Sequence, residues 1–206
     1  ANEGDGGWNT SDYAIDPTKS YVYGVYAWQL GNDGTVYLGC SGTDTEYLGG
    51  GVADNPYFWN GDLHVDGRWY LIIGVLHHEG YTGGDTGVAG VYDVENGAKI
   101  FDGSEFRVGA GSTVHRHRCY HYYNPTGDDS TIHQKMARPF VIPMSRFKGT
   151  DELTKKMWTG QAGADHTGTE LSIRGIQNNS VNADYITDVM NIALNATSNP
   201  NLGALS

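Results

Sequence analysis

Positive charge is scarce in this sequence, which has 13 Lys and Arg against 24 Asp and Glu in 206 residues and a formal net charge of -11. Nucleic-acid binding depends mainly on Lys and Arg, so this balance argues against a nucleic-acid partner. It argues equally against an anionic membrane surface. No apolar run approaches the roughly 20 residues that a membrane-spanning helix needs, and the best, 69–76, has the length of a buried strand. We therefore expect neither nucleic-acid binding nor membrane insertion.

Cysteine and enzyme motifs are also sparse. The only cysteines are Cys40 and Cys119, each inside a strand-like run, and the sequence leaves open whether they pair or remain buried thiols. The chain has no G-x-S-x-G, H-E-x-x-H, P-loop or dinucleotide-binding motif. Its glycine runs at 49–51 and 83–84 precede no phosphate-binding helix.

What the sequence has in abundance is glycine (30 residues) and aromatic side chains, including 14 Tyr and 5 Trp. This composition is typical of short strands joined by tight turns. Turn residues at 31–34 and 95–97 each predict a hairpin between the runs that flank them. Strand-like runs occupy 20–30, 35–40, 68–77, 88–94, 98–101, 105–108, 113–123 and 137–143. The pattern predicts an all-β fold, a jelly-roll β-sandwich over residues 1–147.

The character of the chain changes after residue 147. A capped helix is expected near 150–158, a strand near 170–176 and an apolar helix over 182–195, followed by a polar tail. The second helix is short enough to be marginal alone. We therefore expect residues 148–206 to form a short mixed segment that docks on its own sandwich or helps chains to associate.

The most unusual stretch is 114–123, which reads VHRHRCYHYY. In an extended strand alternate side chains share a face. His115, His117, Cys119 and His121 would then lie on one face, while the arginines and the tyrosines at 120 and 122 would lie on the other. A plain core strand rarely has this composition, so we interpret the stretch as a functional lead.

Several segments of this chain resemble a jelly-roll domain found in bacteriophage tail fibres, other surface proteins and carbohydrate-binding modules. The segments are DPTKSY at 16–21, GTVYLGC at 34–40, NPYFWNGDL at 55–63, WYLI at 69–72, GVYD at 90–93 and the HR-x-Y-x-YY pattern at 117–123. The resemblance covers roughly residues 8–147. It implies a binding domain displayed on a virion or in the extracellular space, usually as a homotrimer, and it carries no catalytic residues.

Two kinds of metal site remain open. An H-x-H pair on a strand places His115 and His117 about 7 Å apart on one face, and phage fibre tips that this chain resembles use such pairs from three chains around a transition metal on the trimer axis. The alternative is a histidine pair hydrogen-bonded at a sheet surface. Turn carboxylates could instead hold a structural calcium, namely Asp5, Asp12, Asp16, Asp128 and Asp129.

The function that we expect is adhesion, that is, reversible recognition of a cell-surface glycan by a phage tail fibre or a similar appendage. Flat aromatic rings suit stacking on sugars, and Trp59 is expected to be the most exposed tryptophan, whereas Phe58 and Trp69 are expected in the core. The predicted ligand-binding residues are Trp59, Tyr57, Trp28, Arg118, Tyr120 and Tyr122.

Two alternatives stay open. One is a polysaccharide lyase or another glycan-active enzyme that uses the His/Tyr strand 115–123 for proton transfer. The other is a structural virion subunit without a ligand. Some phage fibres carry a chaperone domain that cuts itself off after a serine, so the last residue, Ser206, fits either such a cut or an arbitrary end.

Overall fold

A computed structural model of the chain describes residues 5–30, 34–41, 44–122, 133–150 and 153. Nearly all regular structure in these residues is β, with one short 3-10 turn, η2 (Met144–Arg146). The strands are β1 (Asp5–Asn9), β2 (Tyr13–Ala14), β3 (Tyr21–Leu30), β4 (Thr35–Cys40), β5 (Thr45–Tyr47), β6 (Tyr57–Gly61), β7 (Trp69–His77), β8 (Gly90–Asp93), β9 (Lys99–Asp102), β10 (Glu105–Val108), β11 (Val114–His115), β12 (His117–Tyr122) and β13 (His133–Pro143). The expected all-β sandwich is confirmed; the jelly-roll topology stays a prediction.

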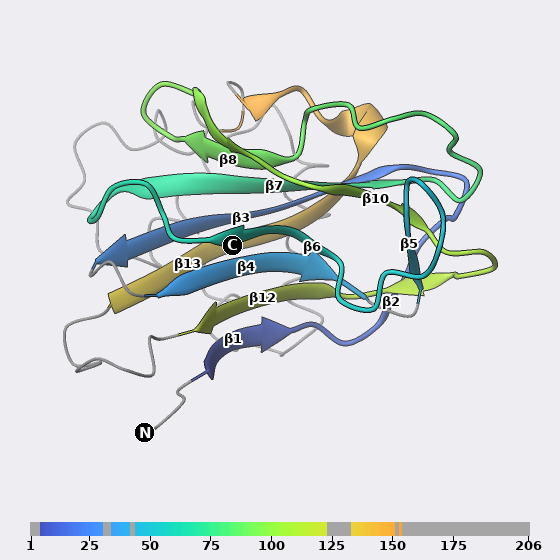
Figure 1. Ribbon diagram of the computed structural model, residues 1–206, viewed down its shortest axis with the longest axis horizontal. Coiled ribbons are helices and arrows are strands. Elements are labelled where there is room, and N and C mark those ends of the chain that lie inside the picture. The colour runs from blue at the N-terminus through green and yellow to red at the C-terminus, as the bar shows by residue number, and fades with distance from the viewer. Residues whose placement is uncertain (1–4, 31–33, 42–43, 123–132, 151–152, 154–206) are drawn as a thin grey trace, which may run out of the picture.

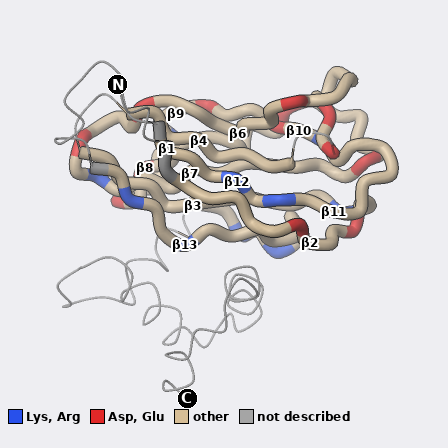
Figure 2. Tube along the Cα trace, turned by 90° about the horizontal axis from the view of Figure 1, so that it is seen from below, with Lys and Arg blue, Asp and Glu red and all other residues tan. Residues whose placement is uncertain are grey.

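The strands form two main layers. One sheet has the order β1-β12-β4-β6, and the other has the path β13-β3-β7-β10-β5, with β8 beside β7 and β9 beside β8. Figure 1 shows the long strands running along the long axis of the molecule. Figure 2, turned by 90°, places β4 and β6 of the smaller sheet above β3 and β13 of the larger one.

One predicted hairpin is correct and one is wrong. β8 and β9 pair antiparallel around the turn at 95–97, where Gly97 has a φ of 74° that favours glycine. β3 and β4, however, do not pair with each other, because β3 lies between β13 and β7 while β4 lies between β12 and β6. The chain therefore changes layer between these strands instead of folding back beside itself.

The main core fills the space between the layers. Its largest fully buried side chains include Tyr23, Tyr70 and Phe58. Phe58 lies directly over Gly74 of β7, where a Cβ atom would come within 2.1 Å of the Phe58 ring. This close approach explains why the most hydrophobic strand of the chain contains a glycine. Trp69, also expected in the core, is only half-buried.

A second apolar cluster covers the outer side of the larger sheet. It contains Tyr26, Leu71, Ile73 and Phe140, and Phe147 and Leu153 pack against it. The Tyr26 hydroxyl donates a hydrogen bond to the Leu153 carbonyl oxygen, 3.2 Å away. Phe147 and Leu153, which follow the last strand β13, therefore lie against the outer side of the larger sheet. The elements expected at 170–176 and 182–195, and all but the first residues of the helix expected at 150–158, lie outside the described residues.

Candidate functional site

The two faces of β12 have different environments. β12 pairs with β1 on one side and with β4 on the other, so it is a central strand of the smaller sheet. His117, Cys119 and His121 are buried and face the core, whereas Arg118 and Tyr120 are half-buried on the outer side. The predicted alternation is therefore correct, and the histidine face is the interior one.

Burial keeps these histidines neutral. His117 stacks on Trp8 and Tyr23, with ring centroids 5.9 and 5.8 Å apart, and its Nε2 donates a hydrogen bond to the Gly24 carbonyl oxygen at 3.2 Å. Burial lowers the pKa of His117 to about 4, although that hydrogen bond acts in the opposite direction. Burial also lowers the pKa of His121 to about 4.

His115 lies on the neighbouring strand β11 and is likewise fully buried. Its Nε2 donates to the Asp44 carbonyl oxygen at 2.9 Å, and burial lowers its pKa. Among the described residues, the Nδ1 atoms of His115, His117 and His121 are buried without a hydrogen-bond partner. A second proton on any of these imidazoles would therefore meet no acceptor.

The two histidines of the predicted metal site are inside the fold. His115 and His117 have 0% exposure, so neither imidazole reaches a surface at which three chains could share a metal. In the described ranges no group of three or more His, Cys, Asp or Glu could hold a metal ion. Metal binding by His115 and His117 stays a prediction, and their burial gives it no support. Cys40 and Cys119 are free and buried, and burial raises the pKa of Cys40 to about 12.

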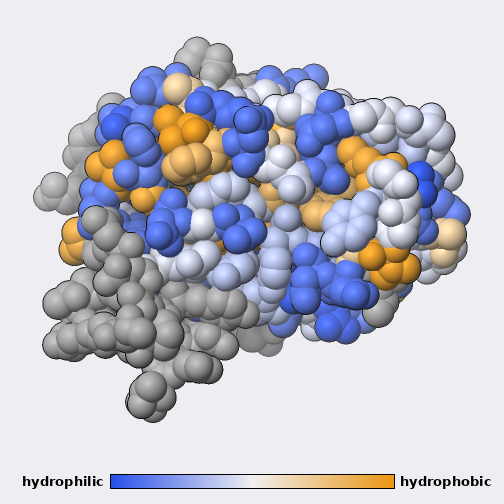
Figure 3. Space-filling view, viewed as in Figure 1, coloured by the Kyte–Doolittle hydropathy of each residue, from blue (hydrophilic) through white to orange (hydrophobic). Residues whose placement is uncertain are grey.

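The outer face of the smaller sheet gathers four large side chains that we call the tyrosine–arginine face: Tyr37, Tyr57, Arg118 and Tyr120. Tyr37 and Tyr120 are opposite each other on β4 and β12, and the Tyr37 and Tyr57 rings meet edge to face at 4.9 Å. All four are half-buried. Figure 3 views the molecule as Figure 1 does and shows mainly blue and pale residues, with the orange ones in separate patches.

Arg118 links the aromatic side chains of this face. Its Cζ lies 5.2 Å from the Tyr57 ring centroid and 5.3 Å from that of Tyr120, within the range of cation–π contacts. The Tyr120 hydroxyl in turn donates to Asn9 Oδ1 at 2.6 Å. Exposed asparagines at 9, 55 and 60 lie around the rings. The result is an aromatic floor with an amide rim.

A β-bulge in β6 decides which of its aromatic residues reach this face. Leu38 pairs with Trp59 but Gly39 pairs with Tyr57, so Phe58 is the extra residue. Phe58 and Trp59 both point into the core, and Tyr57 points out. Trp59 is only 8% exposed, so the expectation that it is the most exposed tryptophan is wrong. Simple alternation could not predict this, because the bulge changes the period.

Gly39 makes room for Tyr57. A Cβ atom at position 39 would lie 2.7 Å from the Pro56 carbonyl oxygen and 2.8 Å from Tyr57 Cδ1. Only glycine lets the Tyr57 ring lie this close to β4. The position of the ring is therefore built into the sheet.

One of the remaining predicted residues, Trp28, does not join this face. Trp28 lies on β3 in the other sheet, where the Lys135 ammonium sits 4.4 Å from its ring centroid. The Tyr122 side chain lies outside the described residues, as do the side chain of Asp5 and all of Asp128 and Asp129. Of the expected calcium ligands, Asp12 pairs with Arg116 and Asp16 with Lys19. Each of these two carboxylates is thus already matched to a cation.

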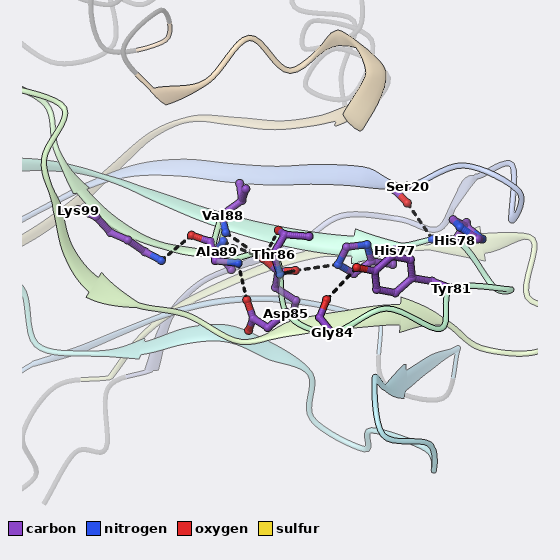
Figure 4. Close-up of polar contacts among 12 residues, drawn as sticks. Ser20, His77, His78, Tyr81, Gly84, Asp85, Thr86, Val88, Ala89 and Lys99 are labelled. Atoms are coloured by element: carbon purple, nitrogen blue, oxygen red, sulfur yellow. Dashed lines mark hydrogen bonds and ion pairs between the residues drawn. The ribbon is translucent and has the colours of Figure 1, made fainter.

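A second polar cluster lies at the end of β7 (Figure 4). The buried carboxylate of Glu105 accepts a hydrogen bond from His77 Nε2 at 2.7 Å. It also accepts bonds from the hydroxyl and backbone N–H of Thr86 and from the N–H groups of Val88 and Ala89. Burial opposes its ionisation, but these bonds outweigh burial and lower the pKa of Glu105 to about 2.

This cluster holds a loop in place. The Tyr81 ring stacks on His77 with centroids 3.8 Å apart, and its hydroxyl donates to the Gly84 carbonyl oxygen. Both Glu105 oxygens are occupied by donors from its own chain. We therefore read Glu105 as the anchor of the connection between β7 and β8 and not as a general base.

Sequence reasoning missed four residues of the outer face: Tyr37, Asn9, Asn55 and Asn60. Tyr37 was visible as the outward residue of an alternating run, but its contact with Tyr120 depends on the pairing of β4 with β12, more than 80 residues apart. The asparagines carry no sequence signal that marks them.

Within the described residues no helix is long and apolar enough to cross a membrane. We found no match to this chain among protein-family models, curated proteins or solved structures.

Proposed function

We propose that this domain binds a cell-surface glycan reversibly through the tyrosine–arginine face. The observation that carries the proposal is a group of three half-buried tyrosines, two of which contact one arginine, with exposed amides beside them. Tyrosine rings offer flat apolar surfaces to the C–H groups of a sugar, while amide and guanidinium groups bond its hydroxyls. Because the sheet fixes the rings, little conformational entropy is lost on binding.

The setting that we propose is a phage tail fibre or a similar surface appendage, with the sandwich as a jelly roll and three chains together. Its support is the resemblance of the sequence segments described above. Multivalency supports it physically, since linked sites raise the effective concentration and make weak single contacts adequate. The molar mass of the full chain in solution, measured by light scattering, tests this part: a monomer would contradict it.

Neither alternative gains support from a specific contact. A lyase that uses the His/Tyr strand needs a base that touches substrate, and its three histidines at 115, 117 and 121 are buried. A structural subunit would bind no glycan at all. The glycan-binding experiment separates that possibility from the proposal.

The test is a glycan array followed by titration calorimetry with the best ligand. Tyr57→Ala should weaken binding about tenfold or more, because a stacked aromatic anchor is removed from the face. Tyr47→Ala is the matched control, since Tyr47 is 51% exposed and lies on β5 in the other sheet. Equal effects of both substitutions, with unchanged melting temperatures, would place the site elsewhere, and an array without any bound glycan would end the proposal.

A further inference from the structure

The positive charge of Arg118 has no carboxylate partner within 4 Å in the described part of the chain. Its four hydrogen bonds all end on neutral oxygens, those of the Cys40 carbonyl, the Asn55 amide and the Tyr57 and Tyr120 hydroxyls. Three other arginines each have a carboxylate partner, namely Arg68, Arg107 and Arg116. Carboxylates are plentiful in a chain with a net charge of -11, yet none in the described part of the chain forms an ion pair with Arg118.

The hydrogen bonds of Arg118 are also long. They measure 3.3, 3.3, 3.4 and 3.2 Å, whereas Arg107 bonds to Glu46 at 3.0 and 2.6 Å. Bonds between a guanidinium and an anion are typically about 2.7–2.9 Å and roughly twice as strong as neutral ones. The surroundings of Arg118 therefore orient the guanidinium without neutralising it.

The aromatic contacts hold the cation in a defined place. The two ring centroids of Tyr57 and Tyr120 are 6.3 Å apart, with the planes at 76°. Since Cζ is 5.2 and 5.3 Å from them, the guanidinium lies in the corner formed by two nearly perpendicular rings and is not sandwiched between them. A cation fixed in this way beside aromatic surfaces is preorganised for an anion, which would compete with the long bonds to neutral oxygens for the N–H groups of the guanidinium.

We propose that the tyrosine–arginine face selects acidic saccharides, with Arg118 binding an anionic substituent of the sugar while the tyrosines contact its ring. This inference rests on the proposed function and names its ligand class. The shared chemistry is a singly charged oxyanion, either a carboxylate or a sulfate ester. The overall negative charge does not prevent such binding, because the Debye length is about 8 Å at physiological salt and distant charges are screened.

The experiment is a panel in which each acidic oligosaccharide is presented beside its neutral form, at physiological salt. The pairs are oligogalacturonate with its methyl ester, sialylated oligosaccharides with their methyl esters, and chondroitin sulfate with chondroitin that is both desulfated and carboxyl-esterified. Chondroitin sulfate modified in only one of these two ways keeps one anionic group and separates sulfate from carboxylate. We expect at least tenfold tighter binding of an acidic member than of its neutral form. The pair that shows the difference identifies carboxylate or sulfate as the source.

Arg118→Gln should remove this preference. Arg116→Gln is the matched control, because it makes the same charge change two residues away on an arginine that is already paired with Asp12. Arg118→Lys, which keeps the charge but loses the fork, should retain part of the preference, and melting temperatures report whether each variant folds. Equal binding of acidic and neutral forms would overturn the ligand class and leave glycan binding intact, whereas no binding to any member would overturn both.

Discussion

Mild acid should destabilise this fold through its buried histidines. His117 and His121 have a pKa lowered to about 4 from an ordinary value of 6.5, and that of His115 is lowered as well. Because the pKa is lower in the folded state, protonation favours the unfolded chain. The stability contributed by the neutral imidazoles is therefore complete above pH 6.5 and is lost as the pH falls toward 4.

The size of the effect follows from the shifts. One pKa unit corresponds to 1.36 kcal/mol, so each of His117 and His121 should lower the free energy of unfolding by about 3 kcal/mol once the pH reaches 4. At pH 5 the cost is about 2 kcal/mol for each, hence about 4 kcal/mol together, with a further contribution from His115. Domains of this size are stable by about 5–15 kcal/mol, so the loss is large enough to approach unfolding.

The pH range in which the buried histidines lower stability lies above the range in which the buried carboxylate of Glu105 does so. Glu105 has a pKa lowered from 4.5 to about 2, so its stabilising contribution is complete above pH 4.5 and is lost only below that value. Urea unfolding followed by circular dichroism at pH 7, 6 and 5 isolates the histidines. The free energy of unfolding should fall by about 4 kcal/mol between pH 7 and 5, which corresponds to an average uptake of about 1.5 protons on unfolding and to nearly two at pH 5.

Variants assign the effect to particular rings. His117→Phe keeps a flat ring between Trp8 and Tyr23, so it should preserve packing and reduce the proton uptake by about one. His64→Gln on an exposed side chain serves as the control and should keep the pH dependence of the parent chain. A free energy of unfolding that does not change between pH 7 and 5 would refute the reasoning, because it would mean that these imidazoles are not held neutral by burial.

Two further substitutions test the features that position the site and its neighbouring loop. Gly39→Ala should destabilise the fold by about 1–3 kcal/mol and weaken glycan binding, because the new Cβ atom meets the Pro56 carbonyl oxygen and displaces the Tyr57 ring. Urea unfolding and calorimetry measure the two effects. Gly49→Ala is the control for both, because a Cβ atom at position 49 meets nothing within 4 Å. Glu105→Gln should lower the free energy of unfolding by about 3 kcal/mol and raise amide hydrogen exchange throughout residues 79–89, because an amide nitrogen then faces N–H donors. Hydrogen exchange in this loop equal to that of the parent chain would contradict the anchoring role of Glu105.

The strands were predictable where the signal is local. Alternation and turn residues locate β4, β7 and β10 within a residue of their observed ends, and the turn at 95–97 joins β8 to β9 as expected. The partners of β3 and of β4 could not be predicted from the turn between these two strands, since each strand pairs with two others and not with its neighbour in the sequence. Local turn chemistry fixes where a chain can reverse and leaves open which layer it enters.

The orientation of β12 could have been inferred from energetics instead of composition. Burying an arginine costs far more than burying a histidine, because the imidazole can give up its charge and the guanidinium cannot. Of the two faces of 114–123, the one with Arg116 and Arg118 must therefore face solvent. The burial of Trp59 offers no comparable signal, since it depends on the bulge that adds Phe58 to β6.

The two faces of β12 together set the pH range in which the proposed glycan site would keep both its fold and its charge. A sugar carboxylate with a pKa near 4 is ionised above about pH 5, and the guanidinium of Arg118 keeps its charge throughout. The charge pair itself therefore persists to a lower pH than the buried imidazoles tolerate. Binding of an acidic glycan should consequently be lost in step with unfolding, between pH 6 and 4. The buried histidines on the inner face of β12 thus determine the lowest pH at which its outer face can bind.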